Sequence, residues 1–185
     1  MTTVTSPAAR GIAQHLRRLY LVRFGFAITW AVLLFVIGSD LNPTSVTLLV
    51  VYPAFDVVAA VADLRSSRAT APARGLYLNI AVSAVAAVGV AIASASDVPA
   101  VLRVWGAWAI VSGLVQLSVG IARRTLGGQW PMILSGGLSV LVGVGFILAA
   151  GADDPSLAGL AGYAALGGVF FLISALRLGR VAQES

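Results

Sequence analysis

The stretch LYLNIAVSAVAAVGVAIAS, residues 76–94, contains no charged side chain. A helix needs about 20 apolar residues to cross the hydrocarbon core of a bilayer, which is about 30 Å thick. Five further apolar stretches of comparable length lie on either side of it: Leu19–Gly38, Thr44–Leu64, Pro99–Ala122, Trp130–Ala150 and Leu157–Leu178. The sequence therefore predicts an all-α, polytopic membrane protein with six transmembrane helices.

The composition of the whole chain supports this fold class. Of the 185 residues, 59% are hydrophobic and 10% are charged, and the mean hydropathy is +0.96. Soluble domains carry about 25% charged residues, so a water-soluble globular enzyme is excluded. The chain has no cysteine and a single histidine, which excludes disulfides, thiolate catalysis and histidine-based metal sites. We predict no cofactor, no metal and no enzymatic activity.

The arginines indicate how the chain crosses the membrane. All twelve basic residues are arginine, and eleven of them cluster before the first stretch, after the second, after the fourth and at the end of the sixth. We assign Arg23 to the first of these clusters. The alternate loops carry aspartates and no arginine, so the positive-inside rule predicts a membrane protein with both termini in the cytoplasm. The net charge of +5 then reflects topology and not a nucleic-acid partner.

An internal repeat is indicated by a spacing of 56 residues. Pro43, Pro99 and Pro155 are separated by this interval, and so are Arg68, Arg124 and Arg180. We predict one transmembrane domain, residues 13–180, made of three helical hairpins: 13–68, 69–124 and 125–180. Parallel repeats of this kind are related by an axis along the membrane normal.

Short tails flank this domain. We predict a disordered or interfacial cytoplasmic tail at residues 1–12 and a cytoplasmic tail at residues 181–185. Residues 10–18 fit either a short interfacial helix or a continuation of the first transmembrane helix, and the sequence leaves both open.

Three glycine-rich segments carry a resemblance to a known family. They are GAWAIVSGLVQL at 106–117, GGLSVLVG at 136–143 and GYAALGG at 162–168, the last followed by Ser174 to Arg177. In these segments and in the repeated hairpins the chain resembles the HdeD-like proteins, which are built from a short repeat of unknown function. The resemblance implies a bacterial inner-membrane protein linked to acid or envelope stress. The first hairpin departs from the pattern, because Asp56 stands where the later hairpins have Ser112 and Gly168.

Two charged residues within the apolar stretches are candidate binding residues. Asp56 lies near the middle of the second stretch, three residues after Pro53. A central aspartate costs about 2.5–3.5 kcal/mol on insertion scales, so it normally faces the bundle interior and has a partner. It is either a proton or cation site or a protonated side chain that donates to a neighbouring helix. Arg103 lies about one turn from the end of the fourth stretch, where it can snorkel outward; direct contact with Asp56 would be strained.

Small and polar residues form two stripes that predict close helix packing. Gly106, Gly113, Gln116 and Gly120 share one face of the fourth stretch, and Ser135, Ser139 and Gly143 share one face of the fifth. Such stripes let two helices approach closely. They join helices within one bundle or between the protomers of a homo-oligomer, and spacing leaves both open. Trp105, Trp108 and Trp130 are predicted at the membrane interfaces.

Two functions follow from these features. The first is a non-catalytic inner-membrane protein that acts through helix packing, in acid or envelope stress or in membrane organisation. The alternative is a small proton- or cation-linked transporter or channel that uses Asp56. The surroundings of Asp56 discriminate between them: a hydrated cavity favours the transporter, and dry packing against a helix opposes it.

Overall fold

The computed structural model describes residues 7–37, 40–67, 74–122 and 130–181. Within these ranges the chain forms helices and turns and no strand. The helices are α1 (Pro7–Ile37), α2 (Pro43–Ser67), α3 (Arg74–Ala93), α4 (Val98–Ala122), α5 (Trp130–Ala149) and α6 (Ala158–Val181). The prediction of an all-α fold is confirmed, and each predicted stretch corresponds to one helix.

Length and composition make this an integral membrane protein. Five of the described helices are long and apolar enough to cross a bilayer, and α5 contributes a shorter apolar stretch, Ile133–Ala149. At a rise of about 1.5 Å per residue, even the 20 residues of α5 extend over the hydrocarbon thickness. Large apolar side chains such as Phe35, Val85 and Leu148 are more than two-thirds exposed, as expected for surfaces that face lipid.

Of the two structures considered for residues 10–18, the chain adopts the continuous helix. α1 begins at Pro7, so residues 10–18 continue the first transmembrane helix and do not form a separate interfacial one. Of the predicted tail at 1–12, residues 7–12 belong to α1 and residues 1–6 lie outside the described part. Of the predicted tail at 181–185, Val181 ends α6 and the rest lies outside it.

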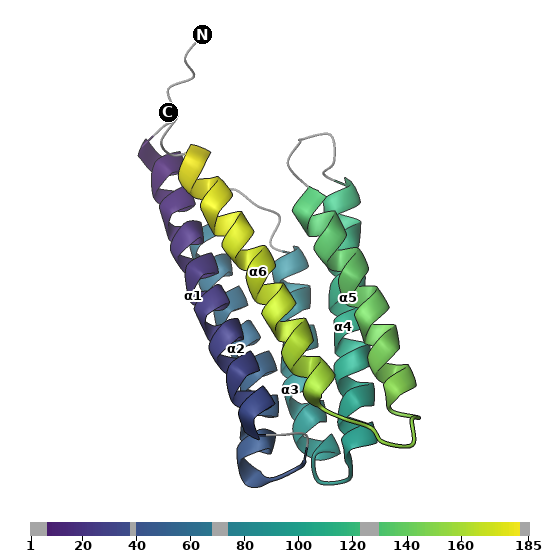
Figure 1. Ribbon diagram of the computed structural model, residues 1–185. Helices are drawn as coiled ribbons and strands as arrows, with labels where there is room; N and C mark the ends of the chain where they lie inside the picture. The colour runs from purple at the N-terminus through teal and green to yellow at the C-terminus, as the bar shows by residue number, and fades with distance from the viewer. Residues whose placement is uncertain (1–6, 38–39, 68–73, 123–129, 182–185) are drawn as a thin grey trace.

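The helices run alternately up and down, with α1 beginning and α6 ending at the same end of the bundle (Figure 1). We call this the termini end and the opposite one the far end. Short turns close the far end, and polar side chains cap the helices that follow them. Asn42 Oδ1 accepts hydrogen bonds from the backbone of Thr44 and Ser45 at 3.0 Å, and Asp97 Oδ1 accepts one from Ala100 at 2.7 Å. The Asp/Asn-Pro turns therefore act as N-caps.

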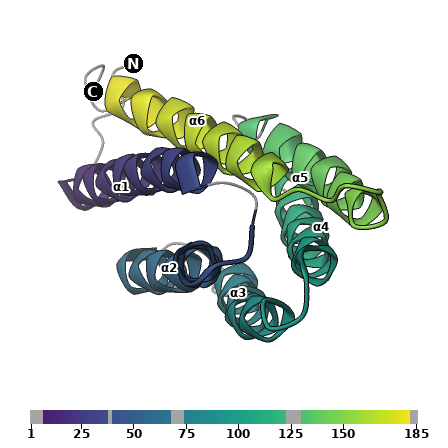
Figure 2. The same cartoon turned by 60° about the horizontal axis from the view of Figure 1, so that its bottom comes forward.

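The six helices form a ring in chain order (Figure 2). The most extensive packing joins α2 to α3, α4 to α5 and α6 back to α1. Contacts across the far-end turns are sparser, and α5 and α6 touch least of the three pairs joined there. A ring of six helices leaves space along its axis, which side chains must fill or line.

Aromatic side chains fill the middle of the ring. Trp30, Tyr52, Trp105 and Trp108 form one cluster with ring centroids 4.6–6.1 Å apart. Trp105 is fully buried and Trp108 nearly so. The predicted interfacial position is therefore wrong for both, because their helix face points into the ring and not toward lipid. Trp130, by contrast, is 70% exposed.

Candidate functional site

A cavity of about 710 Å³ lies inside the ring and is lined by all six helices. Its lining runs from Tyr52 and Trp108 in the aromatic cluster to Leu16, Arg74 and Pro131, which lie where their helices reach the termini end. The cavity therefore occupies the half of the bundle toward the termini. Ligand pockets typically measure about 300–1,000 Å³, so this one has room for a metabolite-sized molecule.

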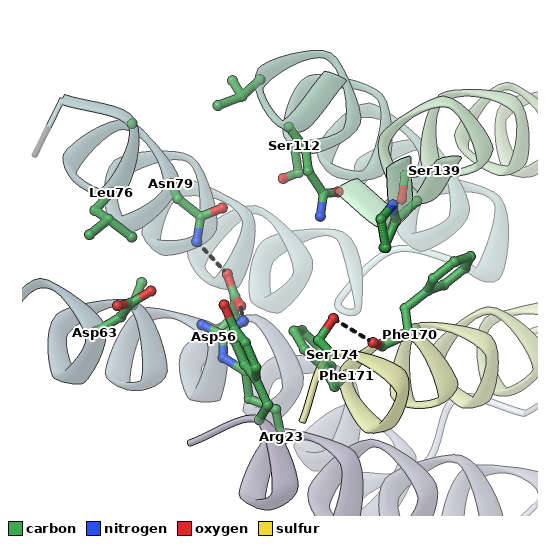
Figure 3. A pocket seen from close by; sticks show the side chains of 18 of the residues that line it. Arg23, Asp56, Asp63, Leu76, Asn79, Ser112, Ser139, Phe170, Phe171 and Ser174 are labelled. Carbon is green, nitrogen blue, oxygen red and sulfur yellow. Dashed lines mark hydrogen bonds and ion pairs between the residues drawn. The ribbon is translucent and has the colours of Figure 1, made fainter. Parts of the chain in front are cut away.

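Asp56 lies on the cavity wall at the centre of a polar cluster (Figure 3). Its Oδ1 accepts a hydrogen bond from Arg23 Nη1 at 2.9 Å, which is also an ion pair. Its Oδ2 accepts hydrogen bonds from Asn79 Nδ2 and Ser83 Oγ, both at 2.8 Å. Asp56 is therefore held by three side-chain hydrogen bonds, one from α1 and two from α3. The ion pair is mostly shielded, with 13% of the Arg23 and 19% of the Asp56 side chain exposed.

The cluster continues into the aromatic layer through Ser83. Trp108 Nε1 donates to Ser83 Oγ at 3.2 Å, while the Ser83 hydroxyl donates to Asp56. Ser83 is fully buried, so this chain of hydrogen bonds satisfies polar groups that water does not reach. Asp56 is thereby held directly by side chains of α1 and α3, and indirectly by Trp108 of α4 through Ser83.

The partner of Asp56 corrects the sequence analysis. Arg23 does not belong to the basic cluster at the membrane edge; it lies within α1, and its guanidinium stands 5.1 Å from the ring centroid of Phe171 on α6. α1 ends at Ile37 and α2 begins at Pro43, so Arg23 and Asp56 lie 14 and 13 residues from the same turn. At about 1.5 Å per residue both are roughly 20 Å from the far end. Counting residues from that turn would have revealed the match.

Arg103 is not part of this site. Its side chain is exposed on the outside of α4, and it is absent from the cavity wall. That Arg103 snorkels outward stays a prediction.

The predicted packing stripes separate into two groups. Gly106, Gly113 and Gly143 lie where α4 meets α5. A Cβ on Gly106 would come within 2.6 Å of the Gly143 carbonyl oxygen, and one on Gly113 within 2.7 Å of the Gly136 carbonyl oxygen. These contacts lie within one chain, so the glycines on this seam pack helices of the same bundle. Sequence analysis missed Gly136, which fits the seam by its spacing of seven residues from Gly143.

The other members of the stripes face the cavity. Gln116, Ser135 and Ser139 line it, and Ser139 Oγ also accepts a hydrogen bond from Tyr163 at 3.0 Å. Gly120 belongs to α4, but its surroundings lie outside the described part of the structure. One face of α4 and α5 therefore provides both close packing and polar lining.

The cavity wall is polar on one side and apolar on the other. The carboxylate and amide side chains of the inner part, Asp56, Asn79 and Gln116, come from α2, α3 and α4, whereas α6 contributes mostly apolar side chains, Leu166, Phe170 and Phe171, together with the hydroxyls of Tyr163 and Ser174. The Ser174 hydroxyl, also on α6, donates a hydrogen bond to the backbone carbonyl of Phe170 at 2.9 Å. Such a wall can hydrogen-bond one part of a molecule and pack against another.

No protein-family description, curated protein or solved structure matches this chain. In the described ranges no three His, Cys, Asp or Glu side chains gather as a metal site would require. The geometry of the cavity is therefore the main ground for a functional proposal.

Proposed function

We propose that this protein is a small transporter that binds a solute in its central cavity, with Asp56 as the central binding residue. The observation that carries the proposal is that Asp56 lines a cavity of about 710 Å³. A carboxylate retained inside a membrane domain normally marks a binding or proton pathway. The aromatic cluster closes the cavity toward the far end, so we place the entry of the solute at the termini end.

The Arg23–Asp56 ion pair supports coupling to a proton or cation. A proton or cation bound by the Asp56 carboxylate would weaken its attraction to Arg23 and change the hydrogen bonds that join α1, α2 and α3. A charge change at one residue would then alter the contacts of three helices. This is the kind of local event that alternating access requires.

We place the protein in a bacterial inner membrane, with the termini end on the cytoplasmic side. The arginines near the termini end and the aspartates at the far end support this orientation. The three-hairpin repeat is supported by the ring, in which chain-ordered helix pairs alternate between extensive and sparse packing. It is also supported by the cavity wall, which is lined by a polar residue at the same position of each hairpin: Arg23, Asn79 and Ser135, each 56 residues from the next.

A second proposal concerns the physiological setting. The glycine-rich segments that resemble the HdeD-like family support a non-catalytic role in acid or envelope stress. The close α4–α5 seam made by these glycines is the observation that favours helix packing as part of that role. The two proposals are compatible, because a stress-linked membrane protein can also bind a solute.

Proton flux tests the transport proposal. In proteoliposomes that contain a pH-sensitive dye, with potassium and valinomycin to clamp the potential, we expect the wild type to dissipate a pH gradient faster than protein-free vesicles. Asp56→Asn should reduce the rate to that of protein-free vesicles, because the amide cannot carry the proton. Equal flux in the variant, or no flux from the wild type, would refute proton-linked transport through Asp56.

Thiol accessibility tests the cavity itself, since the chain contains no native cysteine. Gln116→Cys and Ser135→Cys place a thiol on the cavity wall, while Leu114→Cys and Leu134→Cys place one on the lipid-facing surface of the same helices. We expect a membrane-impermeant, sulfonate-bearing thiol reagent to modify the cavity positions at least about tenfold faster, because only a hydrated thiol ionises to the reactive thiolate.

The side of addition provides the control. In sealed vesicles of known orientation, the reagent should reach the cavity positions from the cytoplasmic side. Equal rates at cavity-facing and lipid-facing positions would show that the cavity is not hydrated, and faster modification from the opposite side would overturn the proposed direction of access.

A further inference from the structure

The charges that line the cavity cancel. Among the described residues, its wall carries two arginines, Arg23 and Arg74, and two aspartates, Asp56 and Asp63. Arg23 and Asp56 are also paired directly. Beside this pair, in a low-dielectric interior, a ligand with net charge loses its hydration and meets a positive and a negative charge that already compensate each other, which is unfavourable. A net-neutral ligand avoids this cost.

Two buried polar groups at the wall have no partner among the described residues. They are Arg23 Nε and Ser112 Oγ, and both residues line the cavity from different helices. Arg23 can only donate, and a serine hydroxyl can donate and accept. Native proteins rarely leave such groups unsatisfied. Both atoms are themselves shielded from the cavity space, so a ligand with an oxygen acceptor, such as a carboxylate or an amide carbonyl, would bind the amide donors that line the same side, Asn79 and Gln116.

The α6 side of the wall favours an apolar group on the ligand. Phe170 on α6 lies across the cavity from Asn79 on α3 (Figure 3), and Leu166, also on α6, lines the cavity as well. Burial of an apolar group there is favourable by about 25 cal/mol per Å². A purely polar solute or an inorganic ion would leave this wall unused.

We propose that the ligand is a net-neutral amphipathic molecule, uncharged or zwitterionic, with an oxygen acceptor at one end and a ring or aliphatic group at the other. This rests on the proposed solute-binding cavity. The polar end binds on the side of Arg23 and Ser112, and the apolar end packs against Leu166 and Phe170. The Arg23–Asp56 pair selects against net charge because it presents both signs at once.

Four compounds with the same phenylpropyl skeleton provide the test. Phenylpropionamide is uncharged, phenylalanine is zwitterionic, phenylpropionate is anionic and phenylpropylamine is cationic. The readout is protection of Ser135→Cys from the impermeant thiol reagent, expressed as the concentration that halves the modification rate. We expect at least one of the two net-neutral compounds to protect at a concentration about tenfold lower than either charged compound, a difference of about 1.4 kcal/mol.

Charge variants sharpen the test. In the same cysteine background, Asp56→Asn gives the wall one excess positive charge, so the order should shift to favour phenylpropionate. Arg23→Gln gives one excess negative charge and should favour phenylpropylamine. The double variant is neutral again and should restore the preference for a net-neutral compound. Each rate is compared with the unprotected rate of the same variant, so that changes in attraction of the anionic reagent cancel.

The outcomes separate the two proposals. A charged compound that protects the wild type best, protection by none of the four, or one unchanged order in all variants would overturn the ligand class. The cavity would still stand if Ser135→Cys reacts faster than Leu134→Cys. If a single charge variant does not fold in detergent, the wild-type order and the double variant still decide the question.

Discussion

Gly143→Ala is expected to force α4 and α5 apart and to lower the free energy of unfolding by about 1–3 kcal/mol, the usual cost of overpacking. The added Cβ would lie 2.7 Å from the Gly106 carbonyl oxygen and 3.0 Å from the Ile110 backbone nitrogen. Both are backbone atoms, so no side-chain rotation relieves the clash. Reversible unfolding in detergent, followed by circular dichroism, measures the loss.

Gly145→Ala is the matched control on the same helix. A Cβ there meets no atom within 4 Å, and alanine favours helix over glycine by about 1 kcal/mol. Its stability should therefore be unchanged or slightly higher. If the two alanine variants lose stability equally, the α4–α5 seam is not as close as described. Gly106→Ala faces the same contact from the other helix, so its effect and that of Gly143→Ala should not add.

Arg23→Leu is expected to destabilise the bundle by about 3–5 kcal/mol, as the loss of one member of a buried ion pair does. Asp56 would keep its hydrogen bonds from Asn79 and Ser83 but would lose the compensating positive charge. The double variant Arg23→Leu, Asp56→Leu should recover most of the loss, because no unpaired charge remains. A double-mutant cycle from denaturant unfolding in detergent gives the coupling energy.

Arg103→Gln is the control for removal of an arginine as such. Arg103 is exposed and lies off the cavity wall, so its replacement should change stability by no more than about 0.5 kcal/mol. A loss as large as that of Arg23→Leu would mean that charge removal, and not the loss of the Asp56 partner, weakens the bundle. Additive losses in the Arg23 and Asp56 variants would show that the ion pair contributes no coupling.

Sequence reasoning predicted one member of the central ion pair and missed the other. Asp56 could be identified because an aspartate inside an apolar stretch is costly and needs a partner. Arg23 was assigned to the membrane edge because it follows Arg17 and Arg18 closely, although α1 carries it well inside the bundle. Ser83 and Asn79 gave no signal, since isolated polar residues are common in transmembrane helices.

The same division applies to the small-residue stripes. Their spacing indicates which face of α4 and α5 packs closely, but whether the opposite face belongs to the same chain depends on three-dimensional contacts. The structure pairs Gly106 with Gly143 and Gly113 with Gly136. Trp105 and Trp108 show the same limit of sequence reasoning. Their positions along the chain fit a membrane interface, but their side chains are buried inside the ring.

The sequence by itself determined the fold class and the number of helices. It also determined the helix bounds to within a few residues, except at the start of α1. This is possible because bilayer thickness sets how long an apolar stretch must be, and because capped Asp and Asn turns end it. Only the tertiary structure decided that the helices close into a ring, that the ring encloses a cavity and that Arg23 meets Asp56. Those outcomes depend on the rotation of each helix about its axis, which is set by packing among all six helices and not by the residues of any one of them.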